Sequence, residues 1–268
     1  MSYKSTKRYA IIILTIITII FAVIATLFIQ PIDSYGADQN GKITITPIET
    51  VEKASSVEIK LKIVEPDVSS AKVTVSYLNV SIYGDKSIVY GKVTRIGSKP
   101  KKTSINVYLQ RKVTGGDWET IDKKLGNAFT TQATVTVKGS TESLTRFWRV
   151  KLTGKFNGET ISYSTYGNIL FNKKASKYPK HYKETVSQKK LWIPPTNLKV
   201  AQASRDQNFR KKYIEKFKKD YPKANVNWST REIHHMRPLK WGGTNKLSNG
   251  IGLTKAEHKF LTAWWASY

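Results

Sequence analysis

Residues 231–260, "REIHHMRPLKWGGTNKLSNGIGLTKAEHKF", hold three of the four histidines of this 268-residue chain, at positions 234, 235 and 258. The residues that precede Pro238 are compatible with a strand. Trp241 to Asn245 have the residue types of a tight loop. The Thr-Lys-Ala-Glu sequence at 254–257 forms a capping box, which predicts a helix that starts at Thr254 and carries His258 in its first turns. The stretch therefore predicts a strand, a glycine-rich loop and a helix, in that order.

The histidine doublet in the predicted strand divides two roles between neighbouring residues. Because successive strand residues point to opposite faces, His234 and His235 cannot do the same job. One imidazole can bind a metal ion together with His258, while the other takes a proton from water. The chain has no cysteine, so thiolate zinc sites, disulfides and cysteine nucleophiles are excluded. For a lone doublet, ordinary core or surface histidines would be the better interpretation.

The ordered set of residues in this stretch resembles the HNH family, the ββα-metal endonucleases that include colicin-type DNases and bacterial toxin domains. The matching residues are Glu232, His234, His235, Pro238, Gly242, Gly243, Asn249, His258 and the residues around them. The resemblance implies that His234 and His258 bind a metal ion and that His235 is the general base. It also implies that Asn249 fixes the loop and that Glu232 helps to position an arginine near the phosphate.

The sequence departs from the colicin-like pattern at Thr262, where that pattern has a further histidine one turn after the ligand on the helix. Two imidazoles leave the remaining metal positions to water and phosphate, which suits a Mg²⁺-like site better than tight zinc. The expected cofactor is one divalent metal ion, with Mg, Mn, Ni and Zn as alternatives. Arg231, Arg237 and Lys240 are candidates for phosphate contacts, and solvated surface charge is the equally weighted alternative for each.

The amino-acid composition and the basic segment at residues 205–221 support a polyanionic partner. The formal net charge of +26 favours nucleic acid, anionic lipid or an anionic wall polymer. Residues 205–221 place Phe209, Tyr213, Phe217 and Tyr221 at steps of four among lysines and arginines. This spacing predicts an amphipathic helix with a basic outer surface, which ends at Pro222.

The middle of the chain, from Lys42 to about Phe171, alternates apolar and polar residues with period two, as in "VEIKLKI" at 57–63. The alternation and the recurring turn signals predict an antiparallel β-sandwich, possibly immunoglobulin-like in topology. The segment is weakly similar to small β modules of exported proteins of Gram-positive bacteria. It contains no histidine and no catalytic constellation, so a spacer, wall-binding or recognition role is expected.

The amino-terminal region has an uncharged apolar run from Ala10 to Ile29, preceded by basic residues. This layout is typical of a signal peptide or a membrane anchor, and in either case the rest of the chain is exported. The predicted fold is α+β and multidomain. Its predicted parts are a signal peptide or membrane anchor (1–37), a β-sandwich-like module (38–171), a basic linker (172–200) and an HNH nuclease domain (201–268).

The function expected from these features is that of an exported, metal-dependent endonuclease, secreted or anchored facing outward in a Gram-positive bacterium. Its substrate would be nucleic acid, with DNA favoured over RNA, and its role would be that of a toxin or an extracellular nuclease. A toxin would add an immunity protein as a partner, and an uncleaved apolar helix would add the membrane. Two alternatives stay open: a ribonuclease, and an envelope-associated β-sandwich binding protein with a degenerate HNH domain. Thr262, which replaces a histidine of the pattern, is the feature that supports the second alternative.

Overall fold

The computed structural model describes residues 44–53, 55–66, 73–96, 103–126, 134–156, 159–165 and 169–268. The predicted signal peptide or membrane anchor, residues 1–37, lies outside the described residues. Within them, no helix has the length and apolar character needed to cross a bilayer.

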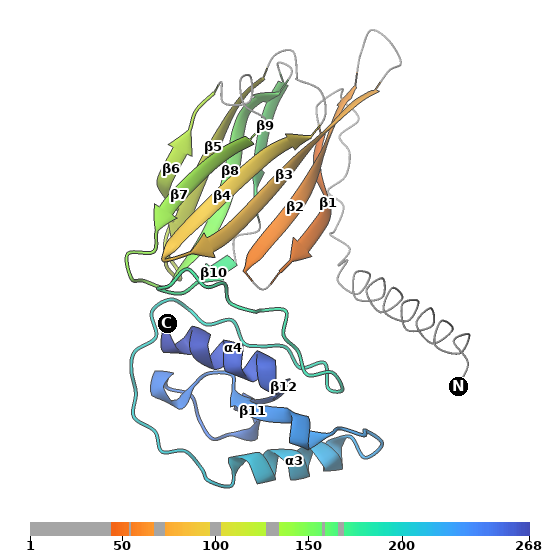
Figure 1. Ribbon diagram of the computed structural model, residues 1–268, viewed down its shortest axis with the longest axis vertical. Coiled ribbons are helices and arrows are strands. Elements are labelled where there is room, and N and C mark those ends of the chain that lie inside the picture. Colours follow the sequence, from red (N-terminus) through yellow and green to blue (C-terminus); the bar gives the residue numbers. More distant parts are fainter. Residues whose placement is uncertain are drawn as a thin grey trace, which may run out of the picture.

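Ten strands form two antiparallel sheets that stack face to face (Figure 1). The first sheet has the order β1-β2-β3-β4-β7, and the second has the order β10-β8-β5-β6, with β9 also paired to β8. The strands are β1 (Thr44–Glu52), β2 (Ser56–Pro66), β3 (Val73–Asp85), β4 (Ile88–Ile96), β5 (Thr103–Lys112), β6 (Glu119–Lys124), β7 (Thr134–Ser140), β8 (Arg146–Phe156), β9 (Glu159–Ser164) and β10 (Ile169–Phe171).

The core between the sheets follows from the period-two pattern, because alternate side chains of each strand point inward. Leu61 and Leu78 from the first sheet meet Val107 and Leu152 from the second, and all four are fully buried. Trp148 fills the same core. The opposite side chains of these strands are largely polar and face solvent, as the burial pattern of β8 shows.

The α+β class predicted from the sequence is wrong, because the described part of the chain is mostly β. It contains twelve strands and only two α-helices, α3 (Phe209–Asp220) and α4 (Lys255–Ala266). The helix expected at 205–221 begins only at Phe209, because Asp206 accepts the Asn208 amide and the Phe209 amide in a turn. Residues 172–208 contribute no helix, so the C-terminal region adds little helical content.

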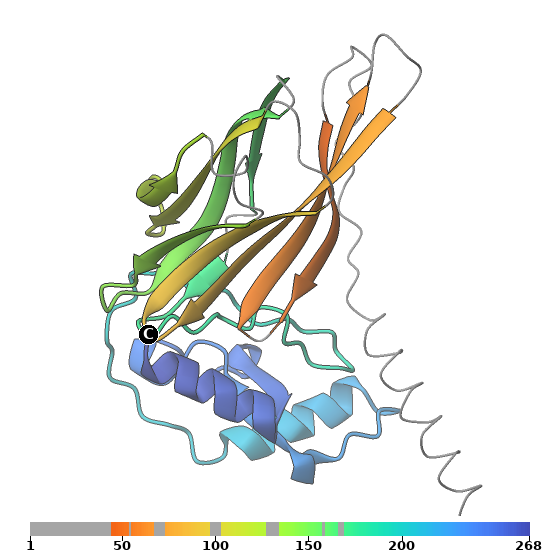
Figure 2. The same cartoon turned by 45° about the horizontal axis from the view of Figure 1, so that its top comes forward.

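The first part of the segment expected to be a linker (residues 172–200), up to Trp192, lies packed between the sandwich and α4 (Figure 2). Asn172 donates its side-chain amide to the Trp264 carbonyl at 2.9 Å, and the Trp264 indole donates to the Ser176 carbonyl at 2.8 Å. The Tyr178 hydroxyl donates to the Trp192 carbonyl at 2.7 Å. These bonds hold the segment as a structural layer between the two folded parts.

A second apolar core joins the sandwich to the C-terminal region. It combines Phe147 and Leu170 from the sandwich, Tyr178 and Leu191 from the connecting segment, and Ile251, Leu253, Leu261, Trp264, Trp265 and Tyr268 from the C-terminal region. Trp264 is only 1% exposed. Because one core contains side chains from both parts, α4 has a fixed position against the end of the sandwich.

Candidate metal and nuclease site

The candidate site is built on a hairpin that lies between two helices (Figure 1). Strand β11 (Arg231–His235) pairs with β12 (Gly250–Thr254) in antiparallel register, with His234 opposite Ile251 and His235 opposite Gly250. Because paired residues share a face and neighbours alternate, the hairpin presents His235 and Gly250 to one helix and His234 and Ile251 to the other.

Helix α3 packs against the face that carries His235. A Cβ atom on Gly250 would lie 2.8 Å from a ring carbon of Tyr213 and 3.0 Å from the ring of Phe209, so only glycine allows this approach. The same close packing lays the His235 ring flat on Phe209, with 4.0 Å between ring centroids and 16° between planes. The aromatic stripe of α3 thus supports the second histidine of the doublet.

Helix α4 packs against the opposite face and brings in His258. Its N-terminus is fixed by the predicted capping box, in which Thr254 and Glu257 each bind the backbone of the other. Leu261 and Trp264 anchor the helix in the shared core. His258, on the first turns, faces His234 with 5.1 Å between ring centroids and 77° between planes. The doublet therefore splits between two helices, as the alternation of a strand requires.

His234 is held as a neutral imidazole. The side chain is 8% exposed, and its Nε2 atom has no hydrogen-bond partner among the described residues. Burial, followed by the charges of His258, His235 and Arg205, lowers the pKa of His234 to about 3. Burial also lowers the pKa of His258, with an opposing effect from Glu232. Both rings therefore offer lone pairs at neutral pH.

These features fit a binding site for a divalent metal ion better than a pair of structural histidines whose ring nitrogens are all hydrogen-bonded. A buried ring nitrogen without a partner is costly unless something binds it, and a metal ion is the ligand that imidazole pairs commonly share. Among the residues that the structure describes, no group of three or more His, Asp or Glu side chains gathers to hold a metal. Thr262 is exposed. A metal at His234 and His258 would complete its coordination with water or phosphate.

His235 has a defined tautomer. Its Nε2 atom lies 3.3 Å from Oδ1 of Asn245. That amide is oriented by two further bonds, since its Oδ1 accepts the Asp206 amide and its Nδ2 donates to the Ser204 carbonyl. Nε2 of His235 therefore carries the proton, and Nδ1 keeps a free lone pair. Burial lowers the pKa of His235, the Asn245 bond raises it, and Arg205 lowers it.

Asn249 bonds across the loop between the two strands. Its Oδ1 accepts the Arg237 amide at 3.0 Å, and its Nδ2 donates to the carbonyls of Arg237 and Thr244, both at 2.9 Å. Glycine is needed at both positions of the pair, because Gly242 has a φ of +79° and a Cβ atom on Gly243 would overlap the Arg237 carbonyl. Asn249 is a positioning residue for the loop that also carries Asn245.

The three predicted phosphate contacts occupy different environments. Arg237 Nε donates to the Trp241 carbonyl at 2.6 Å and its guanidinium lies over the Trp192 ring, which is a structural role. Arg231 donates to Thr185 at 3.2 Å. Lys240 stays exposed beside an open depression of about 430 Å³ that residues 201–204 also line. Of the three, Lys240 has the most accessible charge.

Two arginines near the histidines were missed by the sequence reasoning. Arg210 donates to Glu232 at 3.3 Å and to the carbonyls of Arg231 and Trp228, so it covers the open edge of β11. Arg205 is exposed, and its charge lowers the pKa of all three imidazoles. Glu232 thus pairs with Arg210, and its role in positioning an arginine near the phosphate stays a prediction. Both arginines lie before the motif, where the sequence offers no signal beyond a general excess of positive charge.

Protein-family models, curated proteins and solved structures show no match to this chain. The resemblance to the HNH family rests on the motif residues themselves.

Proposed function

We propose that the C-terminal region, residues 201–268, is a metal-dependent nuclease that hydrolyses phosphodiester bonds in nucleic acid, with DNA as the preferred substrate. The observation that carries the proposal is the split of the doublet. His234 and His258 meet on one face of the hairpin with a buried nitrogen unpartnered, while His235 lies on the other face with its tautomer fixed.

The proposed general base is Nδ1 of His235. The Asn245 bond keeps the proton on Nε2, and the stacked Phe209 ring holds the imidazole plane. Because burial lowers its pKa, the ring is neutral at pH 7 and can accept a proton from water. Asn245 and Phe209 act as positioning residues.

His234 and His258 are the proposed metal ligands, through imidazole nitrogens that burial keeps unprotonated. A divalent ion bound there supplies Lewis-acid stabilisation of negative charge on the phosphate and the leaving oxygen. Arg205, exposed and close enough to influence all three rings, offers a guanidinium to a phosphate oxygen. Arg210 is already held by Glu232 and by two carbonyls, so it stiffens the edge of the site.

The test is a cleavage assay on plasmid DNA and on single-stranded RNA, with Mg²⁺, Mn²⁺, Ni²⁺ or Zn²⁺ and with EDTA. We expect metal-dependent cutting of DNA, and a loss of roughly 10²- to 10⁴-fold in His235→Ala. The matched control is His181→Gln, which changes the one histidine outside the motif and should keep the parent rate. An absence of cutting with every metal, or a His235→Ala rate equal to the parent rate, would refute the proposal.

Metal binding provides a separate readout. In isothermal calorimetry with Mn²⁺ or Ni²⁺, His234→Ala and His258→Ala should each abolish detectable binding, whereas His235→Ala should bind like the parent. Equal affinity in all three variants would place the metal elsewhere.

A further inference from the structure

The outward face of the second sheet is basic and free of carboxylates in its central strands. Inward positions of β5 and β8 are filled by the sandwich core, so the alternate positions point outward. None of the described outward residues of β5, β8 and β9 is acidic: they are Ser104, Asn106, Tyr108, Gln110, Lys112, Phe147, Arg149, Lys151, Thr153, Lys155, Thr160, Ser162 and Ser164. Lys123 of β6 joins the same face opposite Tyr108.

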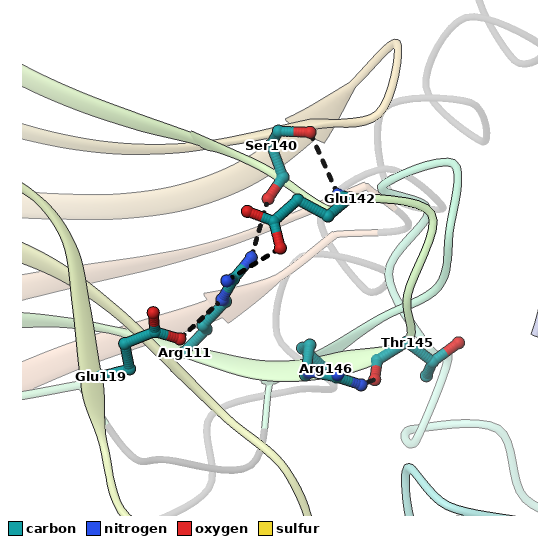
Figure 3. Close-up of polar contacts among 6 residues, drawn as sticks. All are labelled: Arg111, Glu119, Ser140, Glu142, Thr145 and Arg146. Atoms are coloured by element: carbon teal, nitrogen blue, oxygen red, sulfur yellow. Dashed lines mark hydrogen bonds and ion pairs between the residues drawn. The ribbon is translucent and has the colours of Figure 1, made fainter.

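Glu119 and Glu142, which lie next to this face, are drawn toward Arg111 and away from it (Figure 3). Arg111, which is buried, draws Glu119 and Glu142 toward itself, each at 3.0 Å, on the side of the first sheet. Asp122 accepts the amide of Lys138 on β7. The positive charges of the outward face are therefore not neutralised by these neighbouring carboxylates, as they are on an ordinary mixed surface.

The basic face is connected to the nuclease region by Trp118. Lys112 and Arg149 lie over its ring at 4.9 and 4.2 Å, and Trp118 also packs on the shared core that contains α4. From Arg149 to Lys155 the row of β8 extends for about 20 Å, at about 3.3 Å per residue. That length matches about six base-pair steps of duplex DNA at about 3.4 Å each.

We infer that this face binds the phosphate backbone of the nucleic acid substrate, outside the histidine site and without reading sequence. The inference rests on the proposed nuclease function for the identity of the polyanion. Serine, threonine and asparagine side chains between the cations are donors that commonly contact phosphates. The outward positions carry no large aliphatic side chain that would insert into a lipid surface, and Phe147 is covered by the shared core.

The test compares two triple variants of the full-length chain in a His235→Ala background. The face variant is Lys123→Gln, Lys151→Gln and Lys155→Gln, which spares the cations stacked on Trp118. The matched control is Lys62→Gln, Lys92→Gln and Lys138→Gln, which removes three charges from the outer face of the first sheet. Binding to a 40-base-pair duplex is measured in EDTA over a salt series.

The face variant should lower the slope of log K against log salt by up to about 2.7, at about 0.9 per lost phosphate contact. At 0.1 M salt this corresponds to an affinity loss of up to about 500-fold if the 1 M intercept is unchanged. The control should change the slope by less than about 1. Equal slopes in the parent and the face variant, or equal losses in both triple variants, would overturn the inference.

Cleavage with His235 restored separates this inference from the proposed function. An eight-base-pair duplex offers few phosphates beyond those at the histidine site, so it should be cut equally by the parent and the face variant, whereas plasmid should be cut more slowly by the variant. If the face-dependent binding is found but no metal supports cutting, the nuclease proposal fails and the binding face stands. If the face variant loses binding to phosphatidylglycerol vesicles and not to DNA, the face belongs to a membrane and the inference is wrong.

Discussion

Replacing Asn249 with alanine should loosen the loop between β11 and β12, and the hydrogen-exchange rate of one backbone amide should report the change. Asn249 makes three side-chain hydrogen bonds that join Arg237 and Thr244 across the loop. At about 0.5 to 1.5 kcal/mol each, their loss should lower the free energy of unfolding by about 1.5 to 4.5 kcal/mol. Denaturation in urea measures this change.

The sharper readout is hydrogen exchange measured by NMR. The Arg237 amide donates to the side chain of Asn249, whereas the neighbouring Met236 amide donates to the backbone carbonyl of the same residue. In Asn249→Ala the Arg237 amide should exchange about 5- to 12-fold faster relative to Met236, the factor that about 1 to 1.5 kcal/mol corresponds to. The control Asn249→Asp keeps the acceptor for Arg237 and loses both donations, so it should destabilise the fold without this selective effect.

If the exchange rates of the Arg237 and Met236 amides rise by the same factor in Asn249→Ala, the Asn249 side chain does not hold the loop.

The remaining predictions concern the shared core and the buried imidazole. Trp264→Ala should lower the free energy of unfolding by about 3 to 5 kcal/mol, and calorimetry should still show one transition for the sandwich and the C-terminal region. A separate, unshifted transition of the sandwich would contradict a shared core. In the metal-free protein, a pKa of about 3 for His234 means that the unfolded state binds more protons between about pH 6.5 and pH 3. The contribution of His234 to stability should therefore be full above about pH 6.5 and fall toward pH 3. In His234→Asn, the urea midpoint should depend less steeply on pH over this range. An equally steep fall in that variant would assign the effect to other groups.

The features that the sequence predicted well depend on short-range chemistry. The capping box at Thr254 and Glu257 is set by four adjacent residues, so the start of α4 follows from them. The opposite placement of His234 and His235 follows from the pleat of a strand. The alternation of the middle region likewise gives strands whose alternate side chains are buried.

The features that the sequence did not predict depend on contacts between distant segments. Strand β12 contains Gly250 and Gly252, which have low strand propensity, and Gly250 is needed because the rings of α3 approach that face. Asn245 and Arg205 gain their roles only when the loop and the segment before α3 come together at the histidines. The predicted α+β class is wrong because the described residues form twelve strands and only two α-helices, both in the C-terminal region.

Helix α4 follows every other described element in the chain, and the ribosome therefore makes it after them. It supplies His258 and much of the apolar surface that covers the end of the sandwich. A partly synthesised chain that lacks α4 has no His258 to face His234 and only part of the apolar surface that packs on Phe147 and Leu170. One helix thus covers the end of the sandwich and also brings His258 to His234, so a chain that stops before α4 lacks the proposed metal pair.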